Sequence, residues 1–593
     1  MANRPRARAQ TTVPGPPNQA PPNILIVIVD QMRYPTVFPS GISDADMFLS
    51  RFMPNLYRGI WKGGVKFANH FTAATPCSPA RGTLVTGLYS QQTWILENIG
   101  EYPYRPSSKE PWLDPRIPTY GKLLRKAGYQ TPYVGKWHLS IPPQSAPRLD
   151  QYGFDGLTYY DPVGLNLEGT LGNPGAGFLN DKVLLNQAQT WLSASAASAE
   201  PWCLTVSFVN PHDIEFYWGG TEFDTFNRLF DGQTALAPKH FFSWNQGKAF
   251  PPVVSWAADP VKDPTSFGYP VVPANWESYA QLKANKPSLQ AFARLNKQFG
   301  SGGISEDPGE VGFSLQAHVR PNQGIGVAPY SYWQRGLDCY TQLMGIVDQL
   351  IGGLLDAIPP SLVGNTVVVF TSDHGDYAGA HGFVTGKTGS VYDEAFHVPL
   401  IVFDPSGRLT GDVDTPRSGL TSSVDVLPML VALASNGQTG WQDSSFAQIY
   451  ADRHDMMSML KSGAAAGRNY LLLASDTNDV GAPSEQAALN LHVLGLRTQA
   501  YKLGTYAQWT PGTTTLVEDT LETEFYDYTT PEGLAELANT PNDPQAGRVL
   551  KSLLGRFLPN EVRAPLPAPY ADAQADAQQA YLEFVQHYKS QPQ

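Results

Sequence analysis

The stretch Asn23-Ile24-Leu25-Ile26-Val27-Ile28-Val29-Asp30 indicates the fold class. It is a short aliphatic, mostly β-branched run that follows two prolines and ends on an acidic residue. A continuous apolar run of this length is typical of a strand buried on both faces of a parallel sheet. The run therefore predicts an α/β protein whose sheet is covered by helices on both sides.

Two later units repeat this pattern of helix and strand. The first is an amphipathic segment that stops at Gly128 and leads into a short apolar run. The second is a longer helical period followed by an apolar run that passes directly into Asp373-His374-Gly375-Asp376. Such crossovers connect parallel strands, so we expect a large, mixed but mostly parallel sheet flanked by helices. Helices are expected over 120–127 and 337–355, and strands over 131–134, 203–209, 366–370 and 398–403.

Changes of composition divide the chain. Residues 1–22 are predicted to be a disordered tail, and residues 23–466 the main α/β domain. Within it, residues 215–330 are aromatic, Pro- and Gly-rich and without clear periodicity, which is more typical of a lid or pocket wall. Residues 467–593 alternate as antiparallel strands do, then become helical. They predict a smaller C-terminal α+β subdomain that contains an antiparallel sheet and ends in a terminal helix.

Composition also argues against several classes of protein. The formal net charge of −12, without a basic stripe, argues against a nucleic-acid partner. No apolar run approaches the ~18 residues that span a bilayer, so no membrane partner is expected. The three cysteines give no disulfide framework, and the N-terminus lacks an apolar signal-peptide core, so a cytoplasmic location is expected. Homo-oligomerisation is left open.

The segment Cys77-Ser78-Pro79-Ala80-Arg81-Gly82 carries the strongest signal of chemistry. A lone cysteine is more often a small buried hydrophobe than a catalyst. Here, however, a cation lies four residues on and a predicted helix begins at the same point. Both features stabilise an anion beside Cys77.

This segment resembles the signature of the type I sulfatase family, in the alkaline-phosphatase-like superfamily. The resemblance implies that Cys77 is oxidised to formylglycine and that Arg81 holds the modified residue. It also implies a formylglycine-generating enzyme as a transient partner. The segments after Tyr470 resemble the C-terminal subdomain of the same family.

Acidic, amide and imidazole side chains follow two predicted strands, and such groups can bind a divalent ion. The resemblance implies that they hold one metal together with residue 77. The commonest family pattern is Asp-Asp with Asp-Asn, whereas Gln31 and His374 stand here. Calcium is the family default, and a nitrogen ligand favours manganese or another transition metal. The implied ligands are Asp30, Gln31, Cys77, Asp373 and His374.

Three further segments match the family. Gly135-Lys136-Trp137-His138-Leu139 implies that Lys136 neutralises sulfate oxygens and that His138 accepts a proton. Asn210-Pro211-His212-Asp213 implies that His212 faces the leaving group. Lys387 matches a lysine that contacts sulfate. The catalytic residues implied in this way are Cys77, Arg81, Lys136, His138, His212 and Lys387.

Together these segments predict hydrolysis of a small-molecule aryl or alkyl sulfate ester by a formylglycine hydrate on a divalent metal. A phosphonate monoester or phosphodiester hydrolase is the nearest alternative, because the same scaffold and nucleophile serve both reactions. Two other hypotheses are a non-catalytic binding protein and an enzyme that uses unmodified Cys77 as a thiolate. Loss of a key residue would support the binding-protein hypothesis, yet Asp30, Cys77, Lys136 and Asp373 are all present. The thiolate hypothesis leaves the two acidic segments unexplained.

Overall fold

The computed structural model describes residues 20–99, 111–140, 149–156, 176–217, 266–317, 324–438, 446–477 and 488–590, except 197 and 199. Nearly all of the predicted N-terminal tail lies outside these ranges. Within them, no helix combines the length and the apolar character that a membrane crossing requires.

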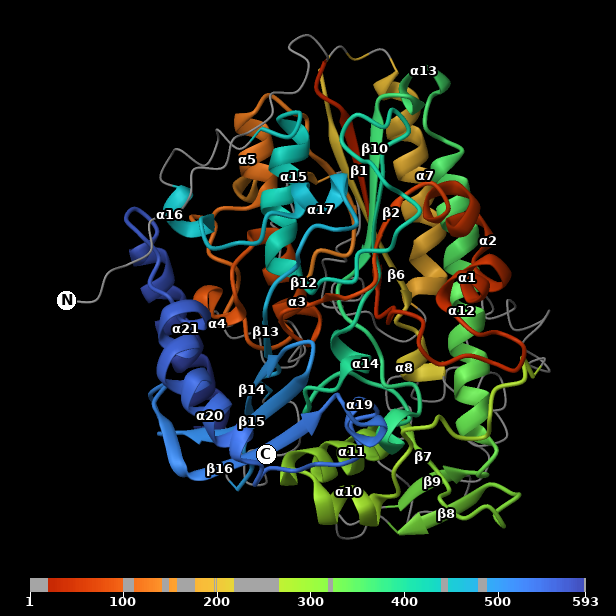
Figure 1. Ribbon diagram of the computed structural model, residues 1–593, viewed down its shortest axis with the longest axis vertical. Coiled ribbons are helices and arrows are strands. Elements are labelled where there is room, and N and C mark those ends of the chain that lie inside the picture. The colour runs from red at the N-terminus through yellow and green to blue at the C-terminus, as the bar shows by residue number, and fades with distance from the viewer. Residues whose placement is uncertain are drawn as a thin grey trace.

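A seven-stranded sheet in the order β2-β11-β10-β1-β6-β4-β5 forms the centre of the molecule (Figure 1). Neighbours from β10 to β5 run parallel, while β11 is antiparallel to both β10 and β2. This confirms the predicted mixed, mostly parallel sheet. The strands are β1 (Asn23–Asp30), β2 (Val65–Phe67), β4 (Pro132–Gly135), β5 (Asp155–Gly156), β6 (Cys203–Pro211), β10 (Thr366–Ser372) and β11 (Leu400–Phe403).

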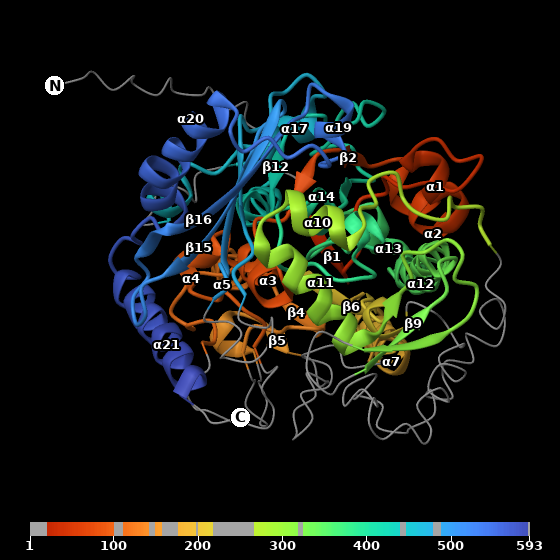
Figure 2. The ribbon, with the colours of Figure 1, turned by 90° about the horizontal axis from the view of Figure 1, so that it is seen from below.

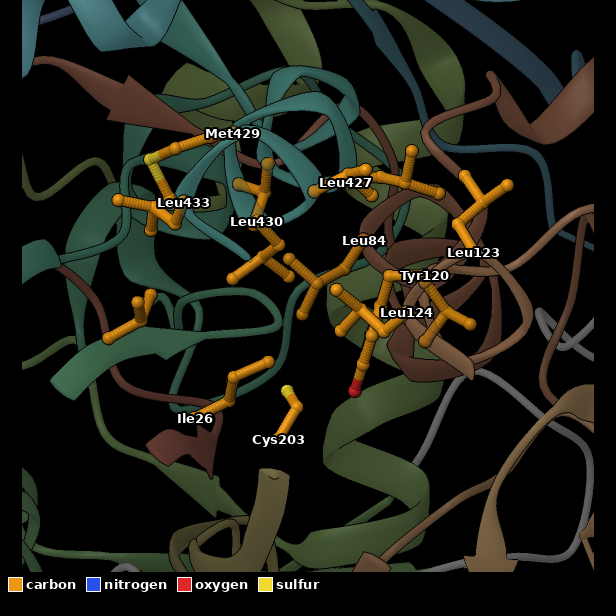
Figure 3. Packing of buried hydrophobic residues seen from close by; sticks show 14 of the residues in the cluster. Ile26, Leu84, Tyr120, Leu123, Leu124, Cys203, Leu427, Met429, Leu430 and Leu433 are labelled. Carbon is orange, nitrogen blue, oxygen red and sulfur yellow. The ribbon is translucent and has the colours of Figure 1, made fainter. Parts of the chain in front are cut away.

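Strand β1 is buried along its whole length, as predicted. Its alternate residues enter two separate cores: Leu25 belongs to the cluster formed with α1, α2, α7 and α12, and Ile26 to the cluster formed with α3, α5, α15 and α17. Figure 3 shows Ile26 and Cys203 facing Leu84 and Leu430 in the second core. The helices are α1 (Ala45–Phe52), α2 (Pro54–Leu56), α3 (Cys77–Thr86), α5 (Tyr120–Lys126), α7 (Ala176–Ser195), α12 (Tyr332–Leu355), α15 (Val426–Ala434) and α17 (Met456–Lys461).

The C-terminal part contains a four-stranded antiparallel sheet in the order β13-β14-β15-β16. It also contains a long final helix, as expected, which packs through Tyr581 against Trp94. Strand β16 is followed by the short helix α19, which ends at Leu534. The elements are β13 (Leu471–Ala474), β14 (His492–Arg497), β15 (Tyr501–Trp509), β16 (Leu516–Asp527), α19 (Pro531–Leu534), α20 (Pro544–Ser552), η8 (Leu553–Val562) and α21 (Ala571–Ser590).

The segment predicted to be an irregular insertion is only partly described, since residues 218–265 lie outside the described ranges. For its second half the expectation of irregular chain was wrong. Helix α11 buries Leu289 and Ala293 against the C-terminal part. This long-range packing stabilises the helix, and local periodicity in the sequence does not indicate it. In Figures 1 and 2, α10 and α11 lie at the end of the molecule toward which β10 runs. The elements are α10 (Tyr279–Asn285), α11 (Ser288–Ser301), β7 (Gly303–Ile304), β8 (Ser314–Ala317) and β9 (Gly324–Ala328).

Candidate active site

The carboxyl ends of β1 and β10 bring two acidic residues together. Asp30 is the last residue of β1, Asp373 follows β10 directly, and both are buried. The two strands are parallel neighbours, with Val29 opposite Ser372. The backbone N–H of Gln31 donates to Asp373 Oδ1 at 3.1 Å and ties the two strand ends together. Pairing of strands distant in the sequence therefore creates the site.

Four predicted ligands form one buried cluster. Asp30, Cys77, Asp373 and His374 each offer a donor atom, and these atoms lie within 4.8 Å of one another. The sulfur of Cys77 is 3.1 Å from His374 Nε2 and 4.0 Å from Asp30 Oδ1. Cys77 is also the first residue of α3, whose N-terminal dipole end favours negative charge at this position. The structure thus assembles these four residues from three distant segments.

Two cations neutralise the acidic pair. Arg81 bridges it, with Nη2 2.9 Å from Asp30 Oδ2 and Nε 2.9 Å from Asp373 Oδ2. Lys136 Nζ lies 2.5 Å from Asp30 Oδ2. Burial alone would raise the pKa of Asp30, but Lys136, His212 and Arg81 outweigh burial and hold that pKa well below its usual value. Asp30 is therefore ionised.

Gly135 lets Lys136 leave β4 beside β6. Its φ is 108°, and a Cβ there would lie 2.0 Å from the carbonyl oxygen of Ser207. Only glycine has both that backbone freedom and that small size. The match to the family segment at residues 135–139 therefore has a physical basis in this close approach of two strands.

His138 and His212 flank Cys77. His138 Nε2 lies 2.8 Å from the carbonyl oxygen of Ile99, which can only accept, so Nε2 carries the hydrogen and Nδ1 has the free lone pair. Burial lowers the pKa of His138 to about 4, against a smaller opposite effect of Cys77. Burial and Lys136 also lower the pKa of His212, while Asp30 and Cys77 raise it. Both imidazoles are thus neutral near pH 7.

Lys387 and Gln31 meet at the edge of the cluster. Lys387 Nζ donates to Gln31 Oε1 at 2.9 Å and also pairs with Glu215. Gln31 Nε2 donates to Asp376 Oδ2 at 2.6 Å and to Glu215 Oε1 at 3.0 Å. The amide of Gln31 is therefore engaged beside the four-residue cluster, and its predicted role as a metal ligand stays a prediction.

Glu215 and Asp376 also belong to the candidate site, although neither was predicted from the sequence. Asp376 accepts from Gln31, from Thr385 Oγ1 at 2.7 Å and from the backbone N–H of Gly386 at 2.9 Å. It shapes the loop that carries Lys387. Glu215 follows His212 by three residues, and Asp376 follows His374 by two. Proximity to a matched segment was the signal that could have found both.

The cluster has the chemistry of a cation site. Burial and then Asp30 raise the pKa of Asp373. Burial lowers the pKa of His374, but Asp373 and Cys77 outweigh it and raise that pKa to about 9. Both raised pKa values show that the cluster favours additional positive charge beside that of Arg81 and Lys136. Two carboxylates and one imidazole are donors that suit a divalent ion, so these residues fit one.

Known proteins resemble this chain in sequence over much of its length. The sequence model of the sulfatase family matches residues 22–436. The chain belongs to the sulfatase family. This sulfatase is 28% identical over 437 residues to the choline-sulfatase of Rhizobium meliloti, covering 70% of this chain and 67% of that one. It is 24% identical over 401 residues to the uncharacterized sulfatase YidJ of Escherichia coli, covering 63% of this chain and only 61% of that one.

Solved structures support the fold of this sulfatase. Phosphonate monoester hydrolase of Agrobacterium radiobacter superposes with a TM-score of 0.58 and 19% identity, covering 94% of this chain and 96% of that one. This similarity extends through the C-terminal sheet and confirms the alkaline-phosphatase-like architecture.

The three cysteines of this sulfatase differ in their surroundings. Burial raises the pKa of Cys203, which packs in the core, and Cys339 packs in the opposite core. Burial and Asp30 would raise the pKa of Cys77 too, but Lys136, Lys387 and His374 outweigh them and hold it well below its usual value. Among the three, residue 77 is the position where negative charge is stabilised.

Proposed function

We propose that this protein is a hydrolase of sulfuric esters, acting on small-molecule aryl or alkyl sulfates. One observation carries the proposal: Cys77 lies at the start of α3, inside a buried cluster with Asp30, Asp373 and His374, and is surrounded by cations. The site therefore combines a nucleophile position, donors for a divalent ion and positive charge for a transferring anionic group.

Residue 77 acts as formylglycine in this proposal, formed from Cys77 by a transient partner, a formylglycine-generating enzyme. Its hydrate carries two hydroxyls on one carbon, one to attack sulfur and one whose deprotonation expels sulfate. Asp30, Asp373 and His374, with Gln31 at the edge, would hold a divalent ion, calcium by family default or manganese because of the imidazole. When bound, that ion supplies Lewis acidity and lowers the pKa of a hydroxyl.

The remaining residues bind charge and move protons. Arg81 fixes the two carboxylates, and Lys136 and Lys387 offset charge on the sulfuryl oxygens. His212 protonates the leaving alkoxide; burial and Lys136 lower the pKa of this imidazole, and the negative charge of a bound substrate raises it. His138 has its Nδ1 lone pair available beside Cys77 and accepts the proton of the second hydroxyl.

Two measurements test the formylglycine proposal. The mass of the peptide that contains residue 77 should be about 18 Da below that of the cysteine form, because a thiol is replaced by an aldehyde. Cys77→Ser and Cys77→Ala should both abolish turnover of 4-nitrophenyl sulfate, while Cys203→Ala, in the core, should retain it. Near-native turnover by either Cys77 variant would sink the proposal.

Hydrolysis of phosphonate monoesters or phosphodiesters is the second candidate. His374 favours it, because an imidazole 3.1 Å from Cys77 replaces the amide of the commonest sulfatase pattern. Rates on 4-nitrophenyl sulfate and on a 4-nitrophenyl phosphonate monoester, measured with one enzyme preparation, separate the two. A higher kcat/KM for the phosphonate would reverse the order of the candidates, and His374→Asn should move the ratio toward sulfate.

A further inference from the structure

Strand β6 carries a bulge immediately before His212. Along β1 and β6 the pairing is regular up to Val29 opposite Phe208, and it then shifts so that Asp30 lies opposite Pro211. Two residues of β6, Val209 and Asn210, therefore have no counterpart on β1. Such an insertion re-aims the chain that follows it, and here that chain is the loop with His212.

Asp181 of α7 binds the bulge. Its Oδ1 accepts the backbone N–H of Val209 at 2.7 Å, and its Oδ2 accepts that of Asn210 at 2.9 Å. Asp181 is 2% exposed, and none of the salt bridges between described residues includes it. A buried carboxylate that takes two successive N–H groups replaces the ladder bonds that the bulge has lost.

Burying the carboxyl group of Asp181 at the bulge costs free energy, which points to a specific role for this contact. Burial raises the pKa of Asp181 well above its usual value, although the two N–H groups oppose burial. Gly177, one turn earlier on α7, is also constrained: a Cβ there would lie 2.4 Å from Cγ of Asn210. Two positions of one helix face are thus fitted to the same two-residue bulge.

We propose that Asp181 is a positioning residue for His212: by capping the bulge at Val209 and Asn210 it fixes the direction in which the imidazole meets the leaving group. The bulge is linked directly to the backbone of His212, because the N–H of His212 donates to the carbonyl oxygen of Val209 at 3.2 Å. This inference rests on the proposed function, in which His212 protonates the leaving alkoxide. Asp181 itself touches no reacting atom.

The dependence of rate on the leaving group tests the proposal. 4-Nitrophenyl sulfate has a leaving group that needs little protonation, whereas phenyl sulfate depends more on a general acid. Asp181→Asn keeps only one acceptor for the two N–H groups and should lower kcat on phenyl sulfate roughly tenfold more than on 4-nitrophenyl sulfate. His212→Ala should show the same selective loss. The double variant should be no worse than His212→Ala, because both changes remove one function.

Asp348 provides a matched control. This buried carboxylate of α12 likewise accepts two successive N–H groups, those of Asn55 at 3.0 Å and Leu56 at 2.7 Å. Asp348→Asn should lower the melting temperature about as much as Asp181→Asn, yet leave the ratio of the two rates unchanged. Gly177→Ala, which presses on Asn210 from the other side, should change the ratio as Asp181→Asn does.

Different outcomes would overturn the positioning role of Asp181 and the general-acid role of His212. If His212→Ala changes the ratio but Asp181→Asn and Gly177→Ala do not, the positioning role is overturned and the function of His212 stands. If His212→Ala leaves the ratio unchanged, both the general-acid role and the positioning role fail. Should Asp181→Asn not fold, Gly177→Ala decides alone.

Discussion

Glu215 and the buried Lys387 form a partly buried ion pair at the edge of the candidate site. Glu215 also pairs with Lys297 of α11 at 3.1 Å, so it connects this helix to the candidate site. Glu215→Gln removes the charge that holds both lysines, and Lys387 then samples more positions. We expect kcat/KM on an aryl sulfate to fall roughly tenfold, mostly through KM. Glu306→Gln, which disturbs the ion pair with Arg294 in the same insertion, should have a smaller effect; equal effects would contradict this role.

Arg81 bridges two carboxylates through two different nitrogens, Nη2 and Nε, a planar two-point geometry that the single ammonium group of a lysine does not reproduce. Arg81→Lys should therefore lower kcat by about a hundredfold or more and reduce the free energy of unfolding by roughly 3 kcal/mol. Activity assays and denaturant titration measure the two effects. Arg125 bridges Asp150 and Asp155 in the same way at the surface. Arg125→Lys should cost less than about 1 kcal/mol and leave kcat intact.

Removal of a divalent ion should destabilise the protein, because the cluster of Asp30, Asp373 and His374 then loses the charge of the ion that binds it. Dialysis against a chelator is expected to lower the melting temperature, and added Ca²⁺ or Mn²⁺ should raise it in proportion to the logarithm of its concentration. Asp373→Asn should weaken this response. Asp425→Asn, at a buried carboxylate paired with Arg468, should preserve it. No shift with either ion at millimolar concentration would argue against the site.

Glu277, which lies outside the cluster of Asp30, Cys77, Asp373 and His374, makes the free energy of unfolding depend on pH. Burial raises its pKa from 4.5 to about 7, against the opposing effect of Lys286. Between pH 4.5 and about 7, Glu277 therefore holds a proton in the folded protein that it has released in the unfolded chain. The contribution of Glu277 to the free energy of unfolding is complete below pH 4.5 and is lost as the pH rises through about 7. The size of this contribution is on the order of 3 kcal/mol. Glu277→Gln should flatten the curve of unfolding free energy over this window, and the exposed Glu518→Gln should not.

The sequence predicted five of the seven strands of the central sheet, and it singled out most of the residues that the candidate site brings together, because both depend on local sequence patterns. A run such as 23–30 is apolar on both faces, and Asp30 and Asp373 follow such runs directly. Glu215 was missed because its importance comes from Lys297 and Lys387, which only the folded chain brings near. Asp181 was missed for a similar reason: nothing in α7 alone indicates a bulge in β6. Helix α11 was missed because its burial depends on the C-terminal part.

The pairing of β1 with β10 also sets an order of events during synthesis. Asn23 pairs with Thr366, so the centre of the sheet cannot close until the ribosome has passed position 366. Cys77 is fully buried afterwards, with no exposed surface. At ordinary translation rates of roughly 5–20 residues per second, the intervening chain takes about 15–60 s to appear. If residue 77 is modified as proposed, the modifying enzyme would have a window of that length in which the residue is still accessible, and the window would end once the chain has folded.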